Sequence, residues 1–147
     1  MKIVIIEDEQ LAARRLENMI KVYDPEIEVV AKLESVSESV DWFNSNPMPD
    51  LILQDIHLED TISFAIFSKV KISCPVIFTT ATDPASTQAF AREKIDCLLK
   101  PIIQKELVAM IEKYRNIPAP AFKHMDASLF KDIMNTSKSS PYESRNN

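Results

Sequence analysis

Five short apolar segments recur along the chain, and a helical pattern separates each from the next. They are residues 2–6, 27–33, 51–53, 76–79 and 97–99. The first is apolar without interruption after Lys2, which is typical of a strand covered on both faces. Strict alternation of strands and helices implies right-handed crossovers and a parallel sheet. The sequence therefore predicts an α/β fold with a doubly wound, five-stranded parallel sheet flanked by helices.

Five helices are expected between and after these strands. Four of them are expected at about 9–23, 62–70, 84–93 and 104–114. The remaining helix would begin after a cap at Ser35 or Ser37 and stop before Asn46. Apolar residues at helical spacing carry these assignments, and Pro84 fits the first turn of its helix.

The composition changes after residue 116. Residues 118–120 (PAP) have the composition of a linker, and Asp126 could cap a short helix that carries Leu129, Phe130, Ile133 and Met134. This stripe either binds a partner or a second copy, or packs on its own domain. The chain is rich in Ser, Lys and Asn from Thr136 onward, which favours disorder. We therefore expect one domain over residues 1–117, followed by a linker, short helix and tail over 118–147.

Polar side chains stand where four of the apolar segments stop. Glu7 and Asp8 follow the first segment, Asp55 the third, Thr80 the fourth and Lys100 the fifth. Ligands of open α/β sheets bind beyond the carboxyl ends of the strands. We therefore expect all five side chains to converge at one edge of the sheet.

This set of side chains suits phosphoryl transfer. Mg²⁺ prefers oxygen ligands and needs only one or two protein carboxylates, which Glu7, Asp8 and Asp55 could supply directly or through water. Three acids placed together are unfavourable without a cation, which argues against a purely structural function. Asp55 would be the nucleophile, while the Lys100 ammonium and the Thr80 hydroxyl would surround the phosphoryl oxygens.

Composition excludes several other functions. The 147-residue chain has no glycine, so it holds neither a dinucleotide fingerprint nor a Walker loop. Its net charge of −5 and the lack of a basic stripe argue against a nucleic-acid face on this chain. Its apolar runs are too short to span a membrane, and no signal-peptide pattern opens it. Cys74 and Cys97 lack metal-ligand spacing, so we expect reduced thiols in a cytoplasmic protein.

Four segments together carry a resemblance to a known family. They are residues 5–9 (IIEDE), 49–56 (PDLILQDI), 78–81 (FTTA) and 98–102 (LLKPI). Found in this order at strand ends, they make residues 1–116 similar to response-regulator receiver domains of the CheY-like type. The resemblance implies a flavodoxin-like fold and a phosphorylation-controlled switch in two-component signalling.

The resemblance also implies a function for each site residue. Asp55 would accept a phosphoryl group from the phosphohistidine of a sensor histidine kinase. Glu7, Asp8 and Asp55 would bind Mg²⁺, with the backbone carbonyl of His57 as a further ligand.

Thr80 and Lys100 would contact the phosphoryl oxygens and report their presence. Such a domain is not an enzyme in the usual sense, because it catalyses only its own phosphorylation and dephosphorylation.

A finer likeness concerns the output. Residues 55–58, 63–64, 76–81 and 98–102 resemble the receivers of LytTR-type transcriptional regulators, in which a DNA-binding domain follows a short linker. We therefore expect the natural protein to continue past Asn147 and to contact DNA only through that further domain. The expected partners are a sensor histidine kinase and a second copy, which would pair through the last helices and strand.

The chain departs from the family at three places. Cys97 stands three residues before the lysine, where receivers usually carry an aromatic switch side chain. Asp60-Thr61 replaces the common Asp-Gly turn, and Thr82 replaces a tyrosine frequent in the subfamily. His57 and Thr82 occupy places that tune dephosphorylation in the family.

Two alternative functions stay open at this point. The first is a pseudo-receiver that is not phosphorylated and serves only as a protein-interaction module, which the change at Cys97 permits. The second is a metal-dependent phosphohydrolase, for which the chain lacks an insertion large enough to form a substrate cap.

Overall fold

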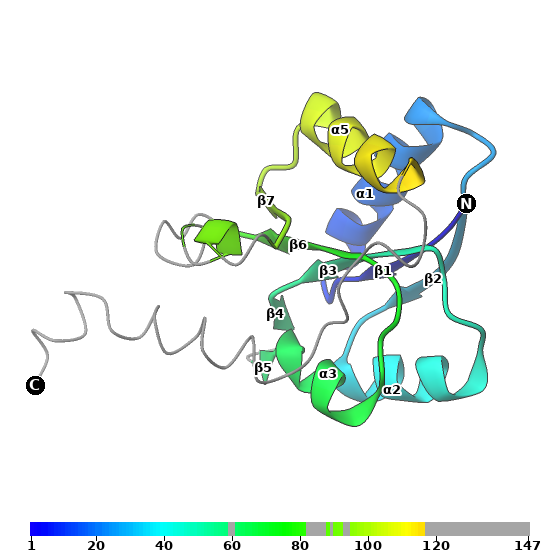
Figure 1. Ribbon diagram of the computed structural model, residues 1–147, viewed down its shortest axis with the longest axis vertical. Coiled ribbons are helices and arrows are strands. Elements are labelled where there is room, and N and C mark those ends of the chain that lie inside the picture. Colours follow the sequence, from blue (N-terminus) through cyan, green and yellow to red (C-terminus); the bar gives the residue numbers. More distant parts are fainter. Residues whose placement is uncertain (59–60, 82–87, 89, 93–94, 117–147) are drawn as a thin grey trace, which may run out of the picture.

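A five-stranded parallel sheet forms the centre of the computed structural model, which describes residues 1–58, 61–81, 88, 90–92 and 95–116. Its strand order is β2-β1-β3-β6-β7 (Figure 1). The strands are β1 (Lys2–Ile6), β2 (Glu28–Leu33), β3 (Leu51–Asp55), β6 (Val76–Thr80) and β7 (Cys97–Leu99). Every pairing among them is parallel, which confirms the predicted fold class.

Helices cover both faces of the sheet. Helices α1 (Gln10–Tyr23) and α5 (Gln104–Arg115) lie on one face, and α2 (Val36–Ser45) and α3 (Ile66–Lys69) lie on the other (Figure 1). Each face has its own apolar core. Because helices bury both faces, the central strands are apolar along their length, as the sequence predicted.

The start of α2 shows how the sequence sets a helix boundary. The Ser35 hydroxyl oxygen accepts a hydrogen bond of 3.0 Å from the Glu38 backbone N–H. The Glu38 carboxylate in turn accepts one of 2.8 Å from the Glu34 N–H. The first bond satisfies a donor that the helix start leaves unpaired, and the second pairs the N–H just before the cap, so Ser35 rather than Ser37 is the cap.

The helix expected over residues 62–70 is shorter than predicted. Strand β5 (Thr61–Ile62) pairs antiparallel with β4 (His57–Leu58), and a 3₁₀ helix, η1 (Ser63–Ala65), precedes α3. The Ser63 N–H donates 2.7 Å to the Ile56 carbonyl. Because the backbone at residues 61–63 bonds to the segment after β3, it is not available for helical hydrogen bonds.

Several predictions lie wholly or partly outside the described residues. Of the helix expected over 84–93, only residues 88 and 90–92 are described, and they are helical. Asp60, Thr82 and the linker, short helix and tail after residue 116 are not described, so the predictions about them stay predictions. Among the described helices, none combines the length and apolarity that a membrane crossing requires.

Candidate functional site

Four neighbouring strands deliver the predicted site residues to one edge of the sheet. Glu7 directly follows β1, Asp55 closes β3, Thr80 closes β6 and Lys100 directly follows β7. In the pairing register, Asp55 lies opposite Thr79, and Thr80 lies opposite Leu99. The sheet therefore places these four residues at the same edge, at the carboxyl ends of neighbouring strands.

Lys100 ties the first and third strands together at this edge. Its ammonium group lies 2.7 Å from Glu7 Oε1 and 2.7 Å from Asp55 Oδ2. Burial alone would lower the pKa of Lys100, but the hydrogen bonds and charges of Asp55 and Glu7 raise it above its ordinary value. The ammonium group is therefore charged at neutral pH. The predicted meeting of Asp55 and Lys100 is confirmed.

Three carboxylates gather around the same point. Oxygen atoms from Glu7, Asp8 and Asp55 all lie within 4.8 Å of one another. Opposite ligands of an octahedral Mg²⁺ stand about 4.2 Å apart, since each bond is about 2.1 Å long. The three acids thus fit a shared Mg²⁺ in donor chemistry and approximate spacing, with water completing the shell.

Glu7 is the most deeply buried of the acids whose pKa shift is resolved at this edge. Its side chain is 2% exposed, and its Oε2 accepts a 3.2 Å hydrogen bond from the Glu9 N–H. Burial raises its pKa to about 7, and the Asp55 charge adds to the rise while Lys100 opposes it. Lys100 thus compensates the charge of the buried Glu7 only in part, and a second cation would be stabilised here.

Thr80 and His57 are placed differently from the charged residues. Thr80 is buried, its carbonyl accepts a 2.8 Å bond from the Lys100 N–H, and its hydroxyl donates 3.0 Å to the Ala81 carbonyl. The His57 residue is exposed, and its N–H donates 3.2 Å to Asp55 Oδ1. Backbone bonds therefore bring both residues to the site. Among the described residues, the Thr80 hydroxyl makes no hydrogen bond to Asp55.

Cys97 holds the position where the family resemblance leads one to expect an aromatic side chain. It lies opposite Phe78 in the sheet and is half-buried. Burial raises the pKa of its thiol to about 12, and the nearby Asp55 charge contributes. The thiol is consequently protonated at neutral pH, and it acts there as a small apolar group.

The sequence analysis missed two polar residues directly under the site. Gln54 and Ser63 are 1% and 0% exposed, and the Ser63 hydroxyl donates 2.6 Å to the Asp55 carbonyl. One feature of the sequence does point to this pair: Gln54 interrupts an otherwise apolar strand. A buried amide needs hydrogen-bond partners, and nothing local supplies them.

The comparisons with known proteins agree with this geometry. The family model described as the response regulator receiver domain matches residues 3–112. The sensory transduction protein LytT of Enterococcus faecalis is 32% identical over 116 residues, which cover 77% of this chain and 47% of that protein. The transcriptional regulatory protein LytR of Staphylococcus aureus strain RF122 is 30% identical over 146 residues, which cover 97% and 58%. The chain thus spans about half the length of these curated relatives.

Solved structures share the fold. The response regulatory domain of protein mrkE from Klebsiella pneumoniae is 25% identical with a TM-score of 0.65, over 78% of this chain and 95% of that one. A putative response regulator from Chloroflexus aurantiacus is 22% identical with a TM-score of 0.64, over 77% and 95%. Both likenesses concern the sheet and helices that hold the site.

Proposed function

The chain belongs to the response regulator receiver domain family, and on this premise we propose that Asp55 accepts a phosphoryl group in a Mg²⁺-dependent reaction. The observation that carries the proposal is the contact of Lys100 with both Asp55 and Glu7, each at 2.7 Å. It joins a nucleophile, a fixed cation and the acidic cluster at the carboxyl end of one sheet. A structural ion pair alone would not need three acids.

The proposed reaction transfers a phosphoryl group from a phosphohistidine. An Asp55 carboxylate oxygen attacks the phosphorus atom, so an O–P bond forms while the P–N bond of the donor breaks and its imidazole leaves. A bound Mg²⁺ would supply positive charge to the phosphoryl oxygens. The Lys100 ammonium would bind one of these phosphoryl oxygens in place of the Asp55 oxygen that it now contacts. The Thr80 hydroxyl would turn away from the Ala81 carbonyl and donate to a second phosphoryl oxygen.

Receiver domains of two-component systems pair with histidine kinases, and this chain offers a surface for such a partner beside the site. Leu11 and Val22 on α1 are 72% and 78% exposed, and Ile103 before α5 is 54% exposed. A cavity of about 300 Å³ lies among Leu11, Val22 and Gln104. Leu11 and Ile103 are at the ends of α1 and α5 nearest the site, while Val22 extends the apolar surface to the far end of α1. Exposed apolar surface favours protein docking, so we propose that the kinase binds along this face.

The output is proposed to be a LytTR-type DNA-binding domain after the linker. This proposal rests on the relatives named LytT and LytR and on the share of their length that this chain leaves uncovered. A groove of about 540 Å³ between β7 and α5, lined in part by Leu99 and Met110, supports pairing of two copies through this face. We place the protein in the cytoplasm, where a histidine kinase would reach it.

One experiment tests the phosphoacceptor directly. Incubation with acetyl phosphate and Mg²⁺ is expected to add the mass of one phosphoryl group to the intact protein. Asp55→Asn should abolish the addition. Asp50→Asn is the matched control, since Asp50 is an exposed acid at the opposite end of the same strand, and it should be phosphorylated normally. An unmodified wild-type mass would favour the interaction module instead.

A further inference from the structure

Ser63 bonds to two consecutive carbonyl groups of the turn that follows Asp55. Its hydroxyl donates 2.6 Å to the Asp55 carbonyl, and its backbone N–H donates 2.7 Å to the Ile56 carbonyl. The N–H groups of the same two peptide units are also hydrogen-bonded. The Ile56 N–H donates to the Thr79 carbonyl at 3.0 Å, and the His57 N–H donates to Asp55 Oδ1 at 3.2 Å. Both peptide planes between Asp55 and His57 are therefore fixed at both ends.

Gln54 fixes the direction of the Ser63 hydroxyl. Its Nε2 donates 2.9 Å to Ser63 Oγ and 3.3 Å to the Ser63 carbonyl. Because Ser63 Oγ accepts this bond, its single hydrogen is directed to the Asp55 carbonyl. Gln54 Oε1 is buried and has no hydrogen-bond partner in the described part of the chain. An amide kept in a core at this disadvantage is more readily explained by the bonds that its nitrogen makes than by stability.

The next carbonyl after the two that Ser63 holds is that of His57. We propose that Ser63, oriented by Gln54, is a positioning residue that aims the His57 carbonyl at the cation between Glu7, Asp8 and Asp55. This inference rests on the proposed function, because it assigns the His57 carbonyl as a ligand. Ser63 touches neither the cation nor the phosphoryl group, so it acts through the turn alone.

A matched pair of serines separates positioning from stability. Ser39 in α2 is also 0% exposed, and its hydroxyl donates 2.7 Å to the Ser35 carbonyl, away from the site. Ser39→Ala therefore controls for the loss of a buried serine hydroxyl, and Ser63→Ala should lower the thermal midpoint somewhat more, because the Gln54 amide also loses a partner. Titration with Mg²⁺ by calorimetry should show roughly 10-fold weaker binding for Ser63→Ala, as is typical when a group that orients a metal ligand is lost. Ser39→Ala should bind Mg²⁺ like the wild type.

A second readout needs no metal. Without Mg²⁺, the amide hydrogens of Ile56 and His57 should exchange faster in Ser63→Ala than in Ser39→Ala, because the turn has lost one of its fixed carbonyls. If Ser63→Ala fails to fold, Gln54→Leu replaces it: this variant keeps the Ser63 hydroxyl but frees its orientation. It should weaken Mg²⁺ binding several-fold while stability stays equal or rises, since the unpartnered amide oxygen is gone.

The two hypotheses fail in different ways. Unchanged Mg²⁺ affinity in Ser63→Ala, or an equal loss in Ser39→Ala, overturns the positioning inference and leaves the proposed function intact. A wild-type protein that does not bind Mg²⁺ overturns both.

Discussion

Charged side chains are arranged differently at the two edges of the sheet. At the carboxyl edge, Glu7, Asp8 and Asp55 lie close together, and Lys100 pairs with Glu7 and Asp55. At the amino edge, Asp24 and Asp96 each pair with one base.

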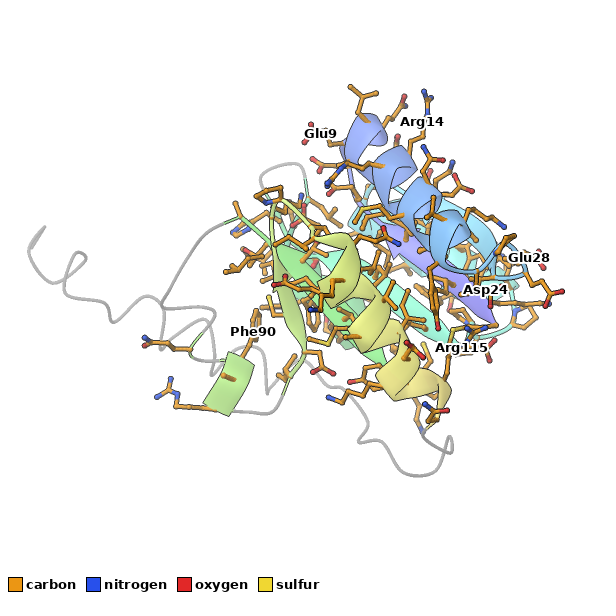
Figure 2. The ribbon with its side chains drawn as sticks, turned by 90° about the horizontal axis from the view of Figure 1, so that it is seen from above. Glu9, Arg14, Asp24, Glu28, Phe90 and Arg115 are labelled. Atoms are coloured by element: carbon orange, nitrogen blue, oxygen red, sulfur yellow. The ribbon has the colours of Figure 1, made fainter. Side chains whose placement is uncertain are left out.

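Both of these pairs are made by bases in the last turn of α5. Asp24 pairs with Arg115 at 2.6 Å, and Asp96 pairs with Lys113 at 2.9 Å. Figure 2 shows Asp24 beside Arg115 at the far end of α1 from Glu9. The balanced edge is built for stability, whereas the crowded edge retains an electrostatic strain that a cation would relieve.

The largest effect that separates the edges should come from removing the lysine at the crowded one. Lys100→Met leaves the buried Glu7 and Asp55 carboxylates without a cation, and we expect a loss of about 2–4 kcal/mol in unfolding free energy in EDTA. Lys113→Met is the control at the other edge. Its side chain is 49% exposed, so the loss should stay below about 1 kcal/mol. Urea unfolding measures both, and equal losses would remove the distinction between the edges.

Neutralising an acid should change the unfolding free energy in opposite directions at the two edges. Asp96 accepts hydrogen bonds from Lys113 and from the Tyr114 hydroxyl. Burial and the bond to Asp96 raise the pKa of Tyr114, so it stays protonated and continues to donate. Asp96→Asn weakens these charge-assisted bonds and should lower the unfolding free energy by about 1–2 kcal/mol.

Asp8→Asn should instead raise the unfolding free energy, by up to about 1 kcal/mol in EDTA, because it relieves repulsion among the three acids. Adding Mg²⁺ should stabilise the wild type by mass action and the variant much less. Thermal unfolding with and without the ion checks both statements. A destabilised Asp8→Asn would mean that this acid makes a structural contribution like that of Asp96.

The smallest effect concerns the Asp24–Arg115 pair. The Arg115 hydrogen bond lowers the pKa of Asp24, so the pair contributes stability at neutral pH that is lost as the pH falls through the pKa of Asp24 in the folded protein. Arg115→Gln should therefore lower the thermal midpoint slightly at pH 7. The difference from the wild type should vanish near pH 2 and shrink in high salt. A difference that is the same at both pH values would point to lost packing on Tyr23 instead.

Much of the architecture could be predicted because it follows from local patterns. The apolar run before Asp55 is of strand length and follows Pro47 and Pro49, which favours a buried strand, and the helical stripe from Leu16 to Ile20 requires a core to pack on. The segment after Asp55 was harder. Its apolar residues Phe64 and Phe67 fit a helix, but long-range backbone bonds convert its start into β5 and η1.

The site divides in the same way. Strand ends in the sequence were sufficient to predict that Glu7, Asp55 and Lys100 would meet, since parallel strands end at a common edge. The hydrogen bonds of Ser63 could not be predicted, because they depend on how the segment from Asp55 to Ser63 folds back onto the end of β3. Gln54, a polar residue in an apolar strand, indicated a buried hydrogen bond but not which residue would be its partner.

The sequence alone determined the order of strands and helices and the residues at the strand ends, because hydrophobic periodicity and chain direction are local properties. Only the tertiary structure decided which acids share Lys100 and which carbonyls Ser63 holds. Those contacts depend on a register between segments 45 and 8 residues apart, and hydrogen bonds tolerate errors of only a few tenths of an ångström.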